Sequence, residues 1–141
     1  MDATVADAGS GAGLPGLVWA VARPDLKVTL IEPLLRRTVF LEEAVAELGL
    51  DQVTVLRARA EDVRQTFDVV TARAVAPMEK LAGWCFPLVR RGGVLLALKG
   101  QRAEEEVASS RVSLHKLGAT DIVVTSYGDL LVPTTVVEVT R

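Results

Sequence analysis

The sequence predicts an α/β fold whose doubly wound, mostly parallel sheet ends in an antiparallel hairpin. Short β-rich runs alternate with helical patterns along the 141 residues, and this alternation is typical of parallel strands with helices on both faces. The last two β-rich runs leave no room for a helix between them, so they are expected to pair antiparallel. The hydrophobic content is 50%, which suits a single packed domain spanning residues 1–141.

Seven β-rich runs predict the strands, and four segments with helical spacing predict the helices. The strands are residues 4–6, 27–31, 53–56, 67–71, 94–98, 122–125 and 135–139, and the helices are residues 14–22, 35–48, 78–89 and 103–117. Pro15 suits the first turn of a helix, whereas Gly49 and Gly118 suit helix C-termini. Arg90 and Arg91 are expected at the end of the third helix, where cations interact favourably with the helix dipole; contact with a phosphate is the alternative.

Composition excludes several classes of protein. With 16 basic and 18 acidic residues the net charge is −2, so nucleic-acid binding would depend on a local basic patch rather than on bulk charge. Cys85 and His115 are the only cysteine and histidine, which excludes an internal disulfide, a cysteine cluster and a multi-histidine metal site. No apolar run is long enough to span a bilayer, and no leader segment opens the chain. A cytoplasmic protein without a bound metal is expected.

The strongest local signal is a glycine-rich run at residues 7–16, DAGSGAGLPG. It follows the first predicted strand and opens the first predicted helix. Glycines let the backbone turn tightly and approach a ligand closely, and the first turn of a helix offers free N–H groups. At the carboxyl edge of a parallel sheet, this arrangement is typical of a site for a nucleotide-like ligand. A merely tight strand-to-helix turn is the alternative.

Two cofactors fit this loop. Gly11, Gly13 and Gly16 match the dinucleotide fingerprint G-x-G-x-x-G, which indicates NAD. Glu32 ends the second predicted strand, where a carboxylate can accept hydrogen bonds from ribose hydroxyls. These two features fit S-adenosylmethionine equally well, so they do not separate the two cofactors.

Three further features favour S-adenosylmethionine over NAD. Asp7 precedes the glycines of residues 9–13 in the arrangement usual for methyltransferases. Ala60 and Glu61 follow the third strand, where a methyltransferase holds the exocyclic amine of the adenine. An antiparallel hairpin at the end of the sheet is also typical of methyltransferases.

The residues after the fourth strand indicate the class of acceptor, because that edge faces the methyl group. Methylation of exocyclic amines usually uses an Asn/Asp-Pro-Pro-aromatic motif there, and residues 71–77 lack it. Methylation of pyrimidine C5 needs a cysteine nucleophile, whereas Cys85 lies in a predicted helix and is expected to pack in the core. Its neighbour Trp84 is expected to pack against the sheet, and stacking on a base is the alternative. An acceptor with its own lone pair, such as guanine N7, needs no general base, so catalysis can depend on positioning.

Two basic residues end predicted strands at the same edge. Arg73 follows the fourth strand, and we expect it to contact a base, a phosphate or the cofactor. The alternative is an ion pair with a nearby carboxylate, that of Glu32, Glu61 or Asp62. Lys99 closes the fifth strand and is either an RNA phosphate contact or a solvated strand end.

Three segments together resemble the GidB/RsmG family of bacterial small-subunit ribosomal RNA methyltransferases. They are residues 7–16, residues 67–74 (FDVVTARA) and residues 97–101 (ALKGQ). The GLPG ending of the first segment and the LKGQ string are the distinctive parts, and the resemblance covers nearly the whole chain. It implies a Rossmann-like class I methyltransferase that transfers methyl from S-adenosylmethionine to guanine N7 in 16S ribosomal RNA, with that RNA or the ribosomal subunit as partner.

The resemblance also implies roles in the glycine-rich run. Gly9 and Leu14 would contact the cofactor, while Gly11 and Gly13 would shape the turn. Family members carry a helical segment before the first strand, and this sequence begins almost at that strand. That segment is expected to cover part of the cofactor cleft and to help grip the RNA.

Further roles follow for residues outside the loop. Ala60 and Glu61 would contact the adenosine, and Arg73 would lie beside the cofactor and the acceptor. Lys99 matches a family lysine that suits an RNA contact. Residues 36–37, both arginine, fall where the family has basic residues, and an ordinary exposed helix face is the alternative. An NAD-dependent oxidoreductase and a non-catalytic domain that binds cofactor or RNA remain the alternatives.

Overall fold

The computed structural model describes residues 3–11, 13, 15–73, 77–99, 103–127 and 134–141. The order of elements is β1 (Thr4–Ala8), α1 (Gly16–Ala22), β2 (Lys27–Ile31), α2 (Leu35–Leu48), β3 (Val53–Leu56), η1 (Ala60–Asp62), β4 (Phe67–Arg73), α3 (Met78–Cys85), η2 (Phe86–Leu88), β5 (Val89–Lys99), α4 (Ala103–Lys116), β6 (Asp121–Tyr127) and β7 (Thr134–Thr140). This order confirms the predicted alternation of strands and helices. Among the described helices, none is long and apolar enough to cross a membrane.

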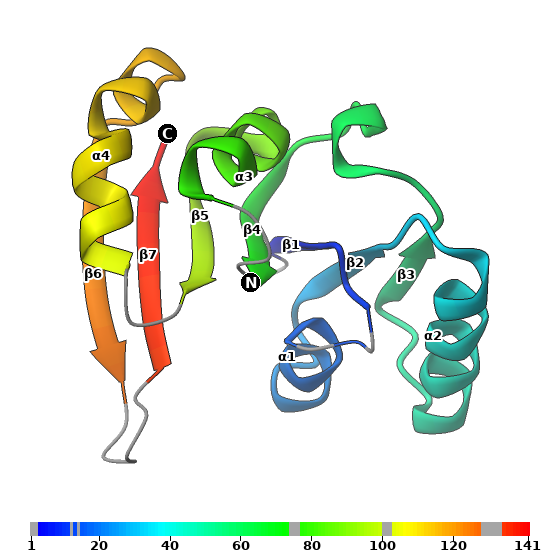
Figure 1. The fold of residues 1–141 in the computed structure, drawn as a ribbon. Helices are drawn as coiled ribbons and strands as arrows, with labels where there is room; N and C mark the ends of the chain where they lie inside the picture. Colours follow the sequence, from blue (N-terminus) through cyan, green and yellow to red (C-terminus); the bar gives the residue numbers. More distant parts are fainter. Residues whose placement is uncertain (1–2, 12, 14, 74–76, 100–102, 128–133) are drawn as a thin grey trace.

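One sheet contains all the described strands, in the order β3-β2-β1-β4-β5-β7-β6. The first five strands pair in parallel, whereas β7 runs antiparallel to both β5 and β6. β6 and β7 therefore form the predicted hairpin at one end of the sheet, and β3 lies at the other end (Figure 1). The chain winds outward in both directions from β1 and β4. In such sheets the carboxyl edge at this switch point is where ligands bind.

Helices cover both faces of the sheet, and the two faces divide the core. Val5 and Leu30 pack with Ala20 of α1 and Leu41 of α2 on one face. Ala6, the neighbour of Val5, belongs to the cluster on the opposite face, which contains α3 and α4. Successive side chains of a strand point to opposite faces, so strands covered on both sides must be apolar throughout. This burial on both faces explains why the strand segments of the sequence are continuous apolar runs.

Helix α2 has the predicted boundaries. Its apolar positions recur at helical spacing, and it ends at Gly49, whose φ of 63° is left-handed. The N–H of Gly49 donates to the carbonyl of Ala46. Glycine adopts this conformation without the steric penalty of a side chain, and so it terminates the helix.

The third helix is shorter than the sequence predicts. α3 ends at Cys85 and the 3-10 turn η2 follows, because Pro87 has no backbone N–H with which to continue the helix. β5 then begins directly after η2, earlier than predicted. The predicted place of residues 90–91 at a helix end is wrong, since both lie in β5, where Arg90 forms an ion pair with Asp68 of β4.

Candidate functional site

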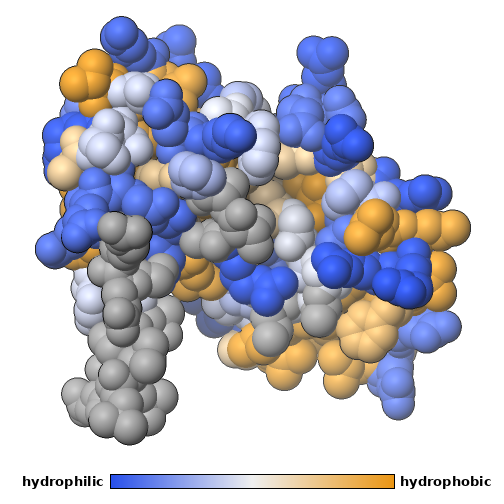
Figure 2. Space-filling view, in the orientation of Figure 1, coloured by the Kyte–Doolittle hydropathy of each residue, from blue (hydrophilic) through white to orange (hydrophobic). Residues whose placement is uncertain are grey.

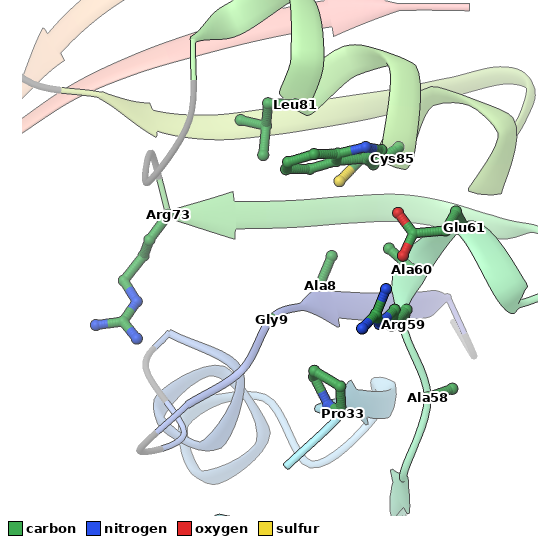
Figure 3. A pocket seen from close by; sticks show the side chains of 11 residues that line it. Ala8, Gly9, Pro33, Ala58, Arg59, Ala60, Glu61, Arg73, Leu81 and Cys85 are labelled. Atoms are coloured by element: carbon green, nitrogen blue, oxygen red, sulfur yellow. The ribbon is translucent and has the colours of Figure 1, made fainter.

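A cavity of about 380 Å³ opens at the carboxyl edge of the sheet, where β1, β2, β3 and β4 end (Figure 3). Most of its walls are apolar. Arg73 lies at one end, and Arg59 and Glu61 lie at the other (Figure 3). The lining residues are Ala8, Gly9, Pro33, Ala58, Arg59, Ala60, Glu61, Arg73, Leu81, Trp84 and Cys85. An apolar cavity with a few polar groups at its ends is the usual form of a small-molecule site.

The buried carboxyl group of Asp7 holds the glycine-rich loop through hydrogen bonds. Asp7 is 1% exposed. Its Oδ2 accepts hydrogen bonds from the hydroxyl of Ser10, at 2.9 Å, and from the N–H of Gly16, at 3.1 Å. Burial raises the pKa of Asp7 to about 6, although these hydrogen bonds act in the opposite direction. Asp7, predicted as a cofactor residue, therefore acts on the loop in this structure and does not line the cavity.

The loop itself adopts a conformation that needs glycine. Gly9, Gly11 and Gly13 have φ of 67°, 58° and 95°, values that side-chain-bearing residues rarely adopt. Gly9 lines the cavity, and its implied contact with the cofactor stays a prediction. Leu14, the other implied contact in this loop, lies outside the described residues.

Glu32 joins the glycine loop to the start of α2. The residue is 2% exposed. Its Oε1 accepts the N–H of Gly11 at 2.9 Å, and its Oε2 accepts the N–H of Leu34 at 2.9 Å. Each carboxylate oxygen has a second lone pair, so this arrangement still permits the predicted contact with ribose hydroxyls. Glu32 does not itself line the cavity.

Arg73 extends from the end of β4 toward the glycine loop (Figure 3). Its Nη2 lies 2.9 Å from the point that a Cβ atom on Gly11 would occupy. Within the described part of the chain, it forms no ion pair with Glu32, Glu61 or Asp62, the alternative that the sequence leaves open. Its guanidinium group is exposed at the mouth of the cavity.

Lys99 lies away from the cavity. Its side chain is 4% exposed, and its Nζ lies 3.0 Å from Oε2 of Glu106 in α4. The solvated strand end considered from the sequence is therefore wrong. An RNA contact through Lys99 stays a prediction that depends on the resemblance.

Helix α3 supplies a wall that the sequence analysis assigned to the core. Leu81, Trp84 and Cys85 lie on one side of this helix and line the cavity. Trp84 is 40% exposed, so the prediction that it is buried against the sheet is wrong. Cys85 is buried, as predicted, and burial raises the pKa of its thiol to about 12. The spacing of these residues is the only signal that could have indicated a shared wall.

Comparison with known proteins identifies the family. The family model described as GidB, rRNA small subunit methyltransferase G, matches residues 1–130. Ribosomal RNA small subunit methyltransferase G of Nocardioides sp. is 58% identical over 143 residues, covering 99% of this chain and 57% of that protein. The protein of the same name from Thermobifida fusca is 56% identical over 142 residues, covering 98% of this chain and 60% of that protein. The chain spans less than two thirds of the length of these relatives.

Solved structures show the same fold. SibL, an S-adenosylmethionine-dependent methyltransferase in its apo form, superposes with a TM-score of 0.80 at 21% identity, covering 99% of this chain and 50% of that one. TYW2 of M. jannaschii, solved with AdoMet, has a TM-score of 0.77 at 21% identity, covering 98% of this chain and 68% of that one. The predicted class I methyltransferase fold is confirmed. Since the family model covers nearly the whole sequence, the chain belongs to the GidB family, rRNA small subunit methyltransferase G.

Proposed function

We propose that this chain is a methyltransferase domain that transfers methyl from S-adenosylmethionine to N7 of a guanine in 16S ribosomal RNA. The cavity at the switch point carries the proposal, because it lies between the glycine loop with Arg73 and the turn with Glu61. The small-subunit RNA or the ribosomal subunit is then the partner, and the cytoplasm is the place of action. The whole chain, residues 1–141, acts as one domain.

The residues that line the cavity suit S-adenosylmethionine in their chemistry. This cofactor, when bound, supplies a methyl group on a positively charged sulfur. The apolar wall of Ala60, Leu81 and Trp84 suits a flat adenine ring, and the carboxylate of Glu61 suits its exocyclic amine. At the other end, the glycine loop and the guanidinium of Arg73 suit a polar amino-acid group.

Two carboxylates outside the cavity lining would support the cofactor site. Asp7 holds Ser10 and the first turn of α1, and Glu32 holds Gly11 while keeping a lone pair for a ribose hydroxyl. Together with Gly9, Gly13, Leu14 and Ala60, they complete the proposed cofactor set. Such support keeps the loop in one geometry, which positional catalysis requires.

The resemblance implies guanine N7 as the acceptor, and the chemistry of this atom supports the proposal. The thiol of Cys85 stays protonated at neutral pH because its pKa is raised to about 12, so it is not a nucleophile. Guanine N7 carries a lone pair and no proton. Its lone pair forms the new bond to carbon, the electrons of the broken bond stay on sulfur, and the positive charge moves to the ring. No side chain has to transfer a proton, and alignment of the two atoms is the main task of the protein.

Arg73 and Lys99 are the proposed residues for the acceptor. Arg73 is exposed at the mouth of the cavity, where it can orient a base or a phosphate. Lys99 is a proposed RNA contact at the end of β5, and its ion pair with Glu106 competes with that contact.

Calorimetric titration of the purified chain with S-adenosylmethionine, and with NADH in parallel, tests the cofactor. We expect binding of S-adenosylmethionine alone. Glu61→Gln and Glu32→Gln remove a charged acceptor while keeping its shape, and each is expected to weaken binding by roughly tenfold or more. Glu47→Gln, on the exposed side of α2, is the matched control.

Methyl transfer is tested with small-subunit RNA and with the assembled subunit, followed by nucleoside analysis for N7-methylguanine. Binding of NADH alone would indicate the oxidoreductase instead. Binding of S-adenosylmethionine without methylation of either substrate would indicate a non-catalytic domain. Methylation at another atom would refute the N7 assignment.

A further inference from the structure

A second hollow opens beside the glycine loop, separate from the cofactor cavity. It has a volume of about 280 Å³ and is lined by Gly11, Arg36, Arg37 and Phe40. We call it the arginine hollow. It shares no lining residue with the cofactor cavity. Both open near the same loop, because Gly9 lines the cavity and Gly11 lines the arginine hollow.

The positive charge in the arginine hollow is poorly compensated. Arg37 has a side chain that is 55% exposed, and its Nη1 lies 3.9 Å from Oε1 of Glu32. That oxygen already accepts the N–H of Gly11 at 2.9 Å. Arg73 approaches the same point: a Cβ atom at Gly11 would lie 2.9 Å from Nη2 of Arg73 and 3.8 Å from Nη1 of Arg37. Two guanidinium groups therefore lie together on one side of Gly11, and such a cluster favours an anion.

The two arginines of α2 do not serve helix stability. Arg36 and Arg37 lie in the first turn, which contains no acidic residue and has no side-chain cap. Cations are unfavourable near a helix N-terminus. Helix α4 has the opposite and favourable pattern, with three glutamates in its first turn and His115 and Lys116 in its last. The charge at the start of α2 is thus better explained by a ligand than by folding.

An exposed aromatic ring completes the arginine hollow. Phe40 is 51% exposed, whereas Phe67 and Phe86 are 1% exposed in the core. Phe40 lies one helical turn after Arg36, so the ring and the guanidinium groups share one face of α2. Figure 2 shows hydrophobic residues gathered over the region of α1 and α2, next to hydrophilic ones. A ring beside guanidinium groups suits a ligand with both a flat base and a phosphate.

We propose that the arginine hollow binds a nucleotide of the substrate RNA that neighbours the methylated guanine. Arg36 and Arg37 hold its phosphate, and Phe40 stacks on its base. This inference depends on the proposed function, since it concerns the same RNA. With a net charge of −2, the chain needs such a local site to hold a polyanion.

The test compares three variants with matched controls. Phe40→Ala removes the ring, and Arg36→Gln and Arg37→Gln each remove one charge. Val39→Ala, also on α2 and 45% exposed, controls for lost apolar surface. Arg111→Gln, on the exposed surface of α4, controls for lost charge. The readouts are the Kd for a small-subunit RNA transcript at several salt concentrations, the Kd for S-adenosylmethionine, and the KM and kcat of RNA methylation.

We expect Phe40→Ala to weaken RNA binding roughly 5- to 150-fold, the effect of one lost base–aromatic stack. Each arginine variant should lower the slope of log K against log salt by up to about 0.7 per lost phosphate contact. Each should raise the KM for RNA more than it lowers kcat. The Kd for S-adenosylmethionine and the behaviour of the two controls should stay at the wild-type values.

Several results would overturn the inference. One is an RNA affinity in all three variants equal to that of the controls, while the wild type binds S-adenosylmethionine and methylates RNA; the proposed function would then stand. Another is a matching loss of S-adenosylmethionine affinity, which would make the hollow a cofactor subsite. A third is that the arginine variants weaken the binding of dextran sulfate, a polyanion without bases, as much as the binding of RNA, while Phe40→Ala has no effect. The hollow would then be a non-specific cationic surface. Failure of the wild type to bind S-adenosylmethionine would refute the proposed function itself.

Discussion

Asp7→Asn replaces a buried carboxyl group by an uncharged side chain of the same shape. The side-chain oxygen of asparagine can still accept hydrogen bonds from Ser10 and Gly16, as Oδ2 of Asp7 does. The variant therefore isolates the cost of ionising Asp7 beneath the loop. We expect it to be more stable than the wild type at pH 8 and to lose this advantage in acid.

The magnitude follows from the pKa of Asp7, which burial raises from 3.8 to about 6. One pKa unit corresponds to about 1.36 kcal/mol, so ionised Asp7 costs the folded protein about 3 kcal/mol relative to the unfolded chain. At a pH between these two pKa values, the carboxyl group of Asp7 is protonated in the folded protein and ionised in the unfolded chain. The free energy of unfolding of the wild type thus falls as pH rises through this window. Roughly half of this cost is expected to appear as a loss of stability between pH 5 and pH 8.

Urea unfolding of both proteins at pH 5, 6, 7 and 8 measures this effect. The other carboxyl groups titrate in both proteins, so their contributions cancel in the difference. The difference should grow with pH up to about pH 7 and then level off. A difference that stays constant over the whole range would refute the argument that burial governs the ionisation of Asp7.

Three further substitutions have expected effects on stability, each measured by urea unfolding. Gly16→Ala places a Cβ atom 2.4 Å from Cδ2 of Leu30, so it should lower the free energy of unfolding by about 1–3 kcal/mol. It should also weaken the binding of S-adenosylmethionine in calorimetry, and wild-type values for both quantities would contradict the loop geometry. Gly83→Ala meets no atom within 4 Å and should stabilise α3 by about 0.5–1 kcal/mol, and a destabilised variant would argue against its helical position. Lys99→Met should cost about 1–3 kcal/mol by leaving the carboxylate of Glu106 unpaired, and Lys99→Met/Glu106→Leu should recover part of it; strictly additive losses would show that the two residues do not interact.

The parallel strands were predictable because each carries its own signal. The runs that form β2 and β3 are continuous and rich in β-branched residues, so their predicted bounds match the structure. The start of β5 was not predictable in this way. Arg141 accepts a hydrogen bond from the N–H of Gly92 and donates one to the carbonyl of Gly93. Strand pairing over such a separation depends on the partner, and local patterns near residues 90–93 contain no information about it.

The same distinction applies to the candidate site: the positions of its residues were predictable from the sequence, and their contacts were not. The positions of Asp7, Glu32 and Arg73 at strand ends follow from the alternation of elements, so the sequence could place them at one edge. Their partners could not be predicted, because hydrogen bonds to loop N–H groups depend on the folded geometry. Lys99 illustrates the limit most clearly: a strand end that looks exposed in the sequence is covered by α4 and paired with Glu106.

The glycine loop links the two proposed ligand sites, and this has a consequence for how their affinities can vary. Gly9 lines the cofactor cavity, while Gly11 lines the arginine hollow. The carboxylate of Glu32 holds Gly11 and stands 3.9 Å from Arg37. A change in the loop itself should therefore affect both ligands. A change in a side chain that lines only one site, such as Phe40 or Glu61, should affect one ligand alone, because no lining residue is shared.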